Sequence, residues 1–592
     1  MSKRLKSCKL LFLEKIKGPE SVKELDAVER QTLIEEMRTA LLLRASVHGG
    51  HVGPDLGFVE AAVALHTVFT SPRDKIVFDV SHQSYPHKML TGRQQAYTDP
   101  AHYDDVSGYT NPAESEHDFF NVGHTSTSIS LASGLAKARD LAGRHENIIA
   151  VIGDGSMSGG EALEGLDAVG ELGTNFIVVF NDNDMSIAEN HGGMYRSFRE
   201  LRETEGQSPN NLFKVMGFDY RFVKDGNDVE ALIAAFEEVR DIDHPVVVHI
   251  VTQKGKGYRP AEEDRETWHW HMPFDLATGK ETVSYVDPYA ELTATYLLKE
   301  MQENPALVAI TAGVPSVMGF TKERREAAGK QFVDVGIAEE QAVAMASGLA
   351  KGGARPVFGT LATFFQRTYD QLAQDVCVNE NPAIFLVFGA SAHALNDVTH
   401  LGLYDIPMMS NIPNLVCLAP TSVAEYQAML TWAIRQTKHP VAIRVPVFAP
   451  EETLPVRTSY DELDRFALVH RGNRVAILGL GNFFGLAQET AAELAQKGID
   501  ATLINPLFIS GIDETMLRDL EKDHALVITI EDGCLAGGFG EKIASFYGTS
   551  SMRVKSYGFA KRFYDRYDVA ELRRANRLTK EQIAEDVITI LS

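Results

Sequence analysis

Cysteine is scarce in this chain, and its positions exclude two common ways of organising a protein. The sequence has only Cys8, Cys377, Cys417 and Cys534, and no two of them have C-x-x-C spacing. A zinc site or a disulfide framework needs clustered or regularly spaced cysteines. Neither is therefore expected, and scattered cysteines fit a reducing compartment.

Long apolar runs are also missing. A membrane-spanning helix needs about 18 or more consecutive apolar residues, and no segment approaches that length. The basic N-terminus (Lys3, Arg4, Lys6) is followed by a short apolar stretch, residues 10–13, without the longer core and cleavage site of a secretory signal. We expect a cytoplasmic protein without a membrane partner.

Positive charge is in short supply. The chain has 57 Lys and Arg against 81 Asp and Glu, a formal net charge of -24. Nucleic acids and anionic membranes bind basic faces, so neither is an expected general partner. A local basic pocket for a phosphorylated small molecule remains compatible with this balance.

What is present is a long chain of ordinary globular composition. Its 592 residues, 44% hydrophobic and 23% charged, exceed what one hydrophobic core supports. The length predicts roughly three or four domains. Three blocks can be distinguished, at residues 1–280, 286–450 and 456–592, each alternating short apolar runs with segments of helical periodicity.

The apolar runs predict buried parallel strands between covering helices. The predicted strands are residues 148–152 and 176–180 in the first block, 307–310 and 384–388 in the second, and 475–478 and 526–530 in the third. Helices are predicted from Gly160 to about Leu172 and from Glu339 to about Ala350. The fold class is therefore α/β, with three open, mostly parallel, doubly wound sheets.

A glycine-rich turn follows the first predicted strand. It reads Gly-Asp-Gly-Ser from position 153, and the next strand ends in Asn-Asp-Asn at position 183. Small residues let the backbone approach phosphate oxygens, and a helix N-terminus favours anions. Asp154 and Asn183 supply the oxygen ligands that Mg²⁺ prefers. A glycine-rich turn alone indicates no more than tight packing, but the second motif favours a metal-bridged diphosphate.

The phrase "GDGSMSGGEALEGLDAVG" followed by "FNDNDMSIAEN" closely resembles the 1-deoxy-D-xylulose-5-phosphate synthase family of the transketolase superfamily. This resemblance covers nearly the whole chain. It implies a transferase of isoprenoid biosynthesis that uses thiamine diphosphate and Mg²⁺. It also implies a homodimer and the names diphosphate-binding, pyrimidine-binding and C-terminal domain for the three blocks. By the same match Asp154, Asn183 and the backbone carbonyl of Met185 hold the metal.

Further phrases carry the resemblance through the first block. They are "GGHVGPDLG", "DVSHQSYPHKMLTGR", "VGHTSTSIS", "TQKGKGY" and "TWHWHMPFD". The resemblance places two catalytic histidines here, His51 and His269. The implied cofactor-binding residues are His82, Gly123, His124, Asp154, Gly155, Ser156, Asn183 and Lys254. Ser81 stands where the family has glycine.

The second block contains the phrases "DVGIAEE", "TFFQRTYDQ" and "NDVTHLG". Thiamine diphosphate becomes reactive when a glutamate bonded to its pyrimidine ring drives tautomerisation, which requires a desolvated carboxyl group. The resemblance gives Glu339 this role, whereas Glu340 fits an ordinary acid on a first helical turn. It also implies that Phe364 stacks on the pyrimidine, that Arg367 lies at the reaction centre and that His400 faces the acceptor.

The implied reaction decarboxylates pyruvate and joins the two-carbon unit to an aldehyde. His51, His269 and His400 would move protons and hold the developing alkoxide. Two alternatives stay open. One is a transketolase-type transfer of a ketol unit between sugars without decarboxylation, and the other is a non-enzymatic scaffold that retains the cofactor.

The sequence departs from the family where the acceptor phosphate should be held. Gly389 and Val447 replace two arginines that grip glyceraldehyde 3-phosphate, and Leu361 and Asn396 replace a tyrosine and an aspartate. Charge-assisted arginine contacts contribute about 1.5–3 kcal/mol each. Unless Arg367, His393, Arg444 or a shifted lysine substitutes, phosphate binding weakens strongly. We expect retained cofactor chemistry with a different or differently held acceptor.

Overall fold

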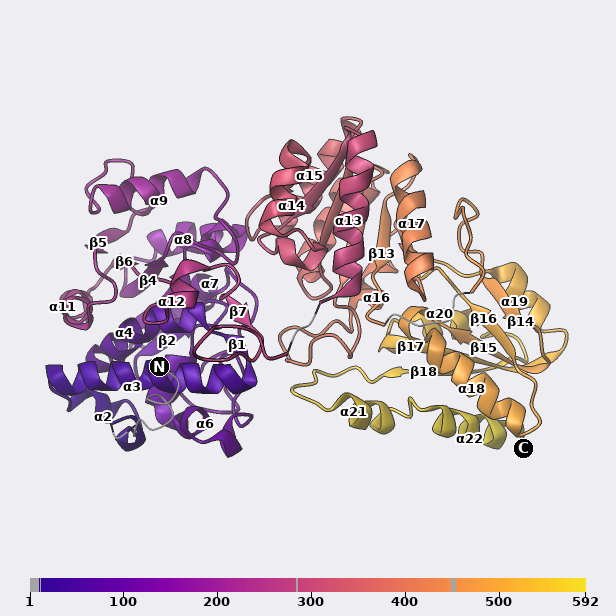
Figure 1. Ribbon diagram of the computed structural model, residues 1–592, viewed down its shortest axis with the longest axis horizontal. Coiled ribbons are helices and arrows are strands. Elements are labelled where there is room, and N and C mark those ends of the chain that lie inside the picture. Colours follow the sequence, from indigo (N-terminus) through magenta and orange to yellow (C-terminus); the bar gives the residue numbers. More distant parts are fainter. Residues whose placement is uncertain (1–9, 11, 284–285, 449–453) are drawn as a thin grey trace. The chain divides into compact units, whose positions relative to one another are not determined.

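The computed structural model describes residues 10, 12–283, 286–448 and 454–592 (Figure 1). Its contacts divide the chain into two compact units. Unit 1 comprises residues 1–285 with 335–338, and unit 2 comprises residues 286–334 with 339–592. The predicted domain boundaries near 450 fall next to residues 449–453, which lie outside the described part of the chain.

Unit 1 is built on a five-stranded sheet whose strands are all parallel. The strand order is β2 (Lys75–Phe78), β3 (Ile148–Gly153), β4 (Phe176–Asp182), β6 (Pro245–Val251) and β5 (Asp219–Val223). A separate antiparallel pair joins β1 (Gly50–His51) to β7 (Trp270–His271). The helices are α2 (Glu20–Lys23), α3 (Ala27–His48), α4 (Gly53–Val68), α5 (Tyr85–Lys88), α6 (Gln95–Thr98), α7 (Ser128–Leu141), α8 (Gly160–Gly170), α9 (Met194–Glu203), α10 (Leu212–Val215), α11 (Val229–Val239) and α12 (Arg259–Glu263).

Helix α4 is apolar around its circumference, and nearly all of its residues are buried. It packs against α3 and α11, and the three helices lie close together in Figure 1. A helix of this kind belongs inside a core because no face of it can meet water. Its rigid start, directly after His51, gives one candidate histidine a fixed base.

Unit 2 contains two sheets. The first is entirely parallel and runs β12 (Val416–Leu418), β13 (Val441–Arg444), β11 (Ile384–Phe388), β10 (Arg355–Leu361), β8 (Leu307–Thr311) and β9 (Phe332–Asp334). The second runs β14 (Ala467–His470), β16 (Thr502–Asn505), β15 (Arg474–Gly479), β17 (His524–Cys534) and β18 (Arg553–Phe559). Its edge strand β14 is antiparallel and its other strands are parallel.

Helices cover both sheets of unit 2, and α18 packs beside α22 (Figure 1). The helices are α13 (Pro288–Glu303), α14 (Lys322–Ala328), α15 (Glu339–Lys351), α16 (Asp405–Met409), α17 (Val423–Arg435), α18 (Phe484–Gln496), α19 (Glu514–Leu520), α20 (Phe539–Phe546), α21 (Val569–Ala575) and α22 (Lys580–Leu591). Two short turns matter below, η7 (Phe364–Thr368) and η9 (Gly481–Phe483).

The predicted fold class is confirmed: three open, mostly parallel sheets alternate with helices. Each predicted strand is present, and β4 and β17 extend beyond their predicted ends. In parallel sheets the carboxyl ends of neighbouring strands meet at one edge, where ligands bind. In the sheet of unit 1, the candidate residues that follow β3 and β4 lie at this edge. In the first sheet of unit 2, those that follow β10, β11 and β13 lie at the corresponding edge.

Candidate active-site residues in the two units

Asp154 follows β3 directly and is held in one orientation. Its N–H donates to Asn181 O at 3.1 Å. Its carboxylate oxygen Oδ2 accepts the N–H of Met185 at 3.0 Å and the side-chain amide of Asn190 at 2.6 Å. Burial, together with the negative charge of Asp182, raises the pKa of Asp154. A buried carboxylate beside a second one is unstable without a nearby cation.

Several polar atoms around Asp154 have no partner. Asn183 Oδ1, Asn190 Oδ1 and Ser186 Oγ are buried and make no hydrogen bond within the described part of the chain. Buried polar atoms are normally satisfied, and unsatisfied ones often mark a missing ion. A hard cation bound by carboxylate, amide and carbonyl oxygens fits this set.

Two details qualify the expected metal ligands. No cluster of three or more His, Cys, Asp or Glu able to hold a metal occurs among the described residues, so the donor set relies on amide and carbonyl oxygens. Met185 directs its N–H toward Asp154. Ligation through the Met185 carbonyl therefore stays a prediction, as does ligation by Asn183.

The turn after Asp154 has room only for small residues. A Cβ on Gly155 would lie 2.9 Å from Ser186, and one on Gly159 would lie 2.1 Å from Ser126 Oγ. Ser126 Oγ in turn donates to Ser156 O at 2.7 Å. Packing against Ser186 and Ser126 therefore requires both glycines, and contact of this backbone with a diphosphate stays a prediction.

The segment with Gly123 and His124 leads into α7, and Ser126 in the same segment bonds to the turn after Asp154. Asp79, at the end of β2, accepts the backbone N–H groups of Ser126 and Ser128 at 2.7 and 2.9 Å. These bonds fix the segment at the carboxyl edge of the sheet. Direct contact of Gly123, His124, Gly155 and Ser156 with a cofactor remains a prediction.

Three predicted histidines lie together in unit 1. The ring centres of His51 and His82 are 5.0 Å apart, those of His51 and His269 are 5.6 Å apart, and those of His82 and His269 are 4.9 Å apart. The pairing of β1 with β7 sets His51 opposite Trp270, next to His269. Residues from three distant phrases of the sequence therefore form one cluster.

Burial favours the neutral form of two histidines of this cluster, His82 and His269. Burial lowers the pKa of His82 to about 4 and holds the pKa of His269 well below its usual value. Lys254 is buried as well, its pKa is lowered to about 7, and its Nζ donates to Ser186 O at 2.7 Å. His269 Nδ1 has no hydrogen-bond partner among the described residues. The cluster can therefore accept hydrogen bonds or protons from a ligand.

The structure shows why a serine is tolerated at position 81, where the family has glycine. Its φ is +60°, a left-handed conformation that glycine adopts without strain. The serine hydroxyl donates to Val122 O at 2.5 Å and accepts the N–H of Thr110 at 2.9 Å. Two buried hydrogen bonds offset the strain, so the substitution preserves the loop beside His82.

Glu339 is the first residue of α15 in unit 2, and its side chain is 2% exposed. Burial raises its pKa, while the charge of Arg367 opposes the rise. Arg367 Nη1 lies 3.5 Å from Glu339 Oε2, yet that oxygen makes no hydrogen bond within the described residues. A desolvated carboxyl group with a free oxygen is what the proposed partner of a pyrimidine nitrogen requires.

Phe364 and His400 lie together on the same unit. Their ring centres are 5.6 Å apart in an edge-to-face arrangement, and burial lowers the pKa of His400 to about 4. Thr399 Oγ1 lies 2.8 Å from His400 Nδ1 and donates to Asp397 at 2.6 Å. His400 is therefore a neutral, oriented imidazole.

The positions of the expected phosphate clamp carry no usable arginine. Gly389 has φ +63°, and a Cβ there would lie 2.9 Å from Leu361 Cδ2. Arg444 at the end of β13 is 4% exposed and bonds to Asp405 at 2.6 Å and to Asp532. Burial opposes its charge, but Asp405 and Asp532 raise its pKa. Arg444 is fully engaged within the protein, so it cannot substitute for the missing arginines.

Several residues were not singled out from the sequence. Asn190 and Asp79 position the candidate metal and phosphate loops, and Tyr109 lies 5.8 Å from His51 between ring centres. Asn190 belongs to the motif phrase itself, which offered a signal. Asp79 is the first residue of the phrase "DVSHQSYPHKMLTGR" and offered the same kind of signal, whereas Tyr109 stands in a segment without periodicity or characteristic spacing.

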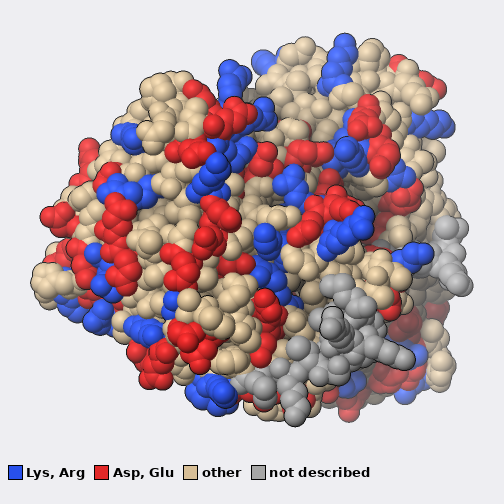
Figure 2. All heavy atoms as spheres, turned by 60° about the vertical axis from the view of Figure 1, so that its left-hand side comes forward, with Lys and Arg blue, Asp and Glu red and all other residues tan. Residues whose placement is uncertain are grey.

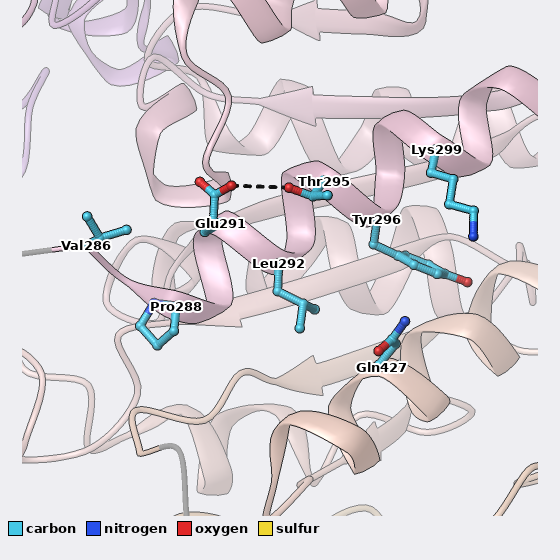
Figure 3. A pocket seen from close by; sticks show the side chains of 8 residues that line it. All are labelled: Val286, Pro288, Glu291, Leu292, Thr295, Tyr296, Lys299 and Gln427. Atoms are coloured by element: carbon cyan, nitrogen blue, oxygen red, sulfur yellow. Dashed lines mark hydrogen bonds between the residues drawn. The ribbon is translucent and has the colours of Figure 1, made fainter.

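A pocket of about 690 Å³ lies between α13 and α17, apart from these residues (Figure 3). Leu292, Tyr296 and Gln427 face it, whereas Glu291 and Thr295 turn toward each other. None of the predicted site residues lines it. We assign it no catalytic role.

Charges of both signs are interspersed over the face shown in Figure 2. Within the described residues, no helix combines the length and apolar character needed to cross a membrane.

Models of known protein families match most of the chain. Residues 13–208 and 203–252 match the N-terminal model of 1-deoxy-D-xylulose-5-phosphate synthase. Residues 288–448 match the transketolase pyrimidine-binding domain, and residues 464–583 match the transketolase C-terminal domain.

Curated relatives match at full length. The 1-deoxy-D-xylulose-5-phosphate synthase of Symbiobacterium thermophilum is 38% identical over 98% of this chain and 95% of its own. Synthase 1 of Geobacter sulfurreducens is 37% identical over 95% of this chain and 94% of its own. A solved transketolase from Campylobacter jejuni is 15% identical, covers 94% of this chain and 99% of its own, and has a TM-score of 0.45.

The N-terminal model and the relatives favour the synthase branch over transketolase itself. The chain therefore belongs to the 1-deoxy-D-xylulose-5-phosphate synthase family, a family of thiamine-diphosphate-dependent transferases.

Proposed function

We propose that this protein is a Mg²⁺- and thiamine-diphosphate-dependent carboligase that decarboxylates pyruvate and joins the two-carbon unit to an aldehyde. The relatives' name supports this reaction. We assign residues 1–280 to diphosphate binding, 286–450 to pyrimidine binding and 456–592 to the C-terminal domain. A homodimer is part of the proposal, and light scattering tests it.

The observation that carries the proposal is Glu339. A buried carboxyl group with a raised pKa and an oxygen that makes no hydrogen bond destabilises a protein that has no use for it. When bound, thiamine diphosphate supplies the nucleophilic carbon of the reaction. Glu339 would hold and exchange a proton at the pyrimidine nitrogen, and Arg367 would limit how far the Glu339 pKa rises.

The residues that we assign to the diphosphate and the metal belong to unit 1. Asp154, Asn183 and the Met185 carbonyl would hold Mg²⁺, and the Gly155–Ser156 backbone would contact the diphosphate. Lys254, which already lies beside Ser186, would add a positive charge. His82, Gly123 and His124 would complete the cofactor contacts from their loops.

The remaining residues would act on the substrates. His51 and His269, whose ring centres are 5.6 Å apart, would approach a substrate carbonyl oxygen, and His400 would face the acceptor aldehyde with Phe364 packed against it. Neutral imidazoles can donate a hydrogen bond to a developing alkoxide and can also carry a proton.

The decisive assay follows ¹⁴CO₂ release from [1-¹⁴C]pyruvate with a panel of aldehydes. Release that requires thiamine diphosphate and Mg²⁺, and that is abolished by EDTA and restored by Mg²⁺, supports the proposal. Ketol transfer from a sugar phosphate without CO₂ release would instead support the transketolase alternative. If the protein binds the cofactor but catalyses neither reaction, the result would support the non-enzymatic scaffold.

A further inference from the structure

Arg573 in α21 is an unusual arginine. It is half-buried, with its guanidinium carbon 5.4 Å from the centre of the Phe483 ring. Its Nε donates to Leu578 O at 3.1 Å, and the terminal nitrogens have no carboxylate or carbonyl partner among the described residues. Burial lowers its pKa, and only the exposed Glu489 opposes the shift. A half-buried cation without a counter-ion is a candidate for binding an anion.

His393 is a second unsatisfied group in the same region. Its Nε2 is buried and has no partner within the described part of the chain. The ring stands edge-to-face on Phe448 at 4.6 Å and on Phe483 at 6.1 Å between centres. Buried ring nitrogens normally find a partner, so this one indicates a missing ligand.

The two groups converge on Phe483. The Arg573 guanidinium carbon lies 5.4 Å and the His393 ring centre 6.1 Å from the centre of the Phe483 ring, and burial and then the charge of Arg573 lower the pKa of His393. Asp532 is the acidic group near His393, but it already accepts from Arg444 and, at 2.7 Å, from Asn482 Nδ2. The region therefore offers unused donors, and the acidic group that acts on Arg573, Glu489, is exposed to solvent.

The residues around His393 lie at the carboxyl ends of parallel strands, which is where ligands bind in such sheets. His393 follows β11, Phe448 follows β13, and Phe483 in η9 follows β15, so all three come from carboxyl ends of parallel strands. The loop after β11 is closed by pairing of Ser391 with Gly402 and also carries His400. One loop thus bears both His393 and the histidine assigned to the acceptor.

We propose that Arg573 and His393 bind the anionic end of the acceptor aldehyde, a phosphate or a carboxylate, in place of the arginines missing at 389 and 447. The proposal rests on the proposed function. Arg573 gives a charge-assisted, bidentate contact, His393 gives one neutral N–H, and Phe483 supports both. This explains how an enzyme with Gly389 and Val447 can hold a charged acceptor.

The test compares matched acceptors on the holoenzyme with Mg²⁺ and thiamine diphosphate. Glyceraldehyde 3-phosphate is paired with glyceraldehyde, and succinic semialdehyde with butanal. The wild type should prefer one charged member by its kcat/KM, which tells phosphate from carboxylate. Arg573→Gln should lower that preference about 10- to 100-fold, mainly through KM, as expected for one charge-assisted contact.

Two further variants and a control separate binding from folding. His393→Phe, which keeps the packing on Phe448 and Phe483, should lower the preference about 5-fold, and Arg573→Lys should fall between wild type and Arg573→Gln. The control is Arg574→Gln, the exposed neighbour that lies 4.0 Å from Glu571. A thermal unfolding midpoint for each variant excludes loss of fold.

A binding measurement stands apart from turnover. Inorganic phosphate titrated calorimetrically into the holoenzyme should bind wild type more tightly than Arg573→Gln, while Arg574→Gln should match wild type. If no aldehyde supports CO₂ release but this difference holds, the proposed function fails and the anion site stands. If wild type shows no preference for charged acceptors, or Arg573→Gln keeps it, the anion site is wrong.

Discussion

The cofactor-side residues and the acceptor-side residues of this protein differ in how their polar groups are satisfied. Around Asp154 and at Glu339, the buried atoms of the described residues without a hydrogen bond are oxygens, whereas on the acceptor side Arg444 is saturated by Asp405 and Asp532 and the unsatisfied atoms are nitrogens of His393 and Arg573. Unsatisfied buried groups cost about 1–3 kcal/mol each, so they persist where a ligand completes them. The contrast indicates that the cofactor requirement is retained and that the acceptor site is rebuilt.

The largest expected effect is a loss of activity on substituting Glu339, the residue that we assign to cofactor activation. Glu339→Gln keeps the size and removes the proton-exchanging carboxyl group, so kcat for CO₂ release should fall about 10²- to 10⁴-fold. Steady-state assays with saturating cofactor measure it. Glu340→Gln, on the same helical turn, should stay within about twofold of wild type. Equal losses in both variants would show that helix α15, and not the Glu339 carboxyl, is responsible.

A smaller effect is expected at Asn190, which supports Asp154 from outside the expected ligand set. Its amide donates to Asp154 Oδ2 at 2.6 Å. Residues that orient a metal ligand typically contribute about 10- to 100-fold to metal affinity. Asn190→Ala should therefore raise the Mg²⁺ concentration needed for half-maximal activity by that factor.

The matched control for this prediction is Asn210→Ala, an exposed amide that contacts Glu200. Mg²⁺ with thiamine diphosphate should raise the thermal midpoint of the control as it does for wild type, and should raise that of Asn190→Ala less. An unchanged Mg²⁺ requirement in Asn190→Ala would remove Asp154 and its surroundings as the metal site.

The sequence predicted the strands that carry the cofactor-side residues better than it predicted the contacts of the acceptor-side residues, for a physical reason. The strands before Asp154 and Asn183 are continuous apolar runs that can only be buried, so the edge where those residues meet follows from the pattern. The cluster of His51, His82 and His269 depended on family phrases, since no local periodicity places residues from three distant segments together.

The acceptor side depends on features that no local pattern carries. Arg444 forms an ion pair with Asp532, which lies in the other sheet of unit 2. Arg573 can be recognised as a candidate only in the structure, because its terminal nitrogens bond to no carboxylate or carbonyl group of the described residues. The left-handed backbone at Ser81 was likewise invisible, because serine rarely adopts it. Tertiary contacts, which a local sequence pattern does not encode, determine the environment of Arg444, Arg573 and Ser81.

Restoring arginines tests whether the acceptor side is truly rebuilt. At position 389, φ of +63° and Leu361 at 2.9 Å oppose any side chain, so Gly389→Arg should destabilise the protein by about 1–3 kcal/mol. It should give no gain in preference for glyceraldehyde 3-phosphate over glyceraldehyde. Thermal unfolding and paired kcat/KM values measure both.

Val447→Arg is the matched comparison, because Val447 is half-buried and already bears a side chain. It should be tolerated with less loss of stability than Gly389→Arg, and any gain in phosphate preference should appear there. A stable Gly389→Arg protein with stronger phosphate preference would show that the acceptor loop still accommodates the missing clamp.

The smallest expected effect is a pH profile that does not change, and it shows where the two sides agree. Burial lowers the pKa of both His82 and His400 to about 4. A histidine with the ordinary value near 6.5 gains its proton as the pH falls below 6.5, so an activity that needs the neutral ring declines there. With the pKa lowered, the ring stays neutral and the decline moves below about pH 5.

At saturating pyruvate, kcat/KM for butanal should therefore be flat from pH 8 to 5 as far as His400 is concerned. Butanal is the right acceptor because it has no ionisable group of its own, whereas a phosphate monoester titrates near pH 6. His400→Asn should lower the whole curve without changing its shape. A decline centred near pH 6.5 that disappears in His400→Asn would mean that His400 is solvated, and that the acceptor side is more open than its burial indicates.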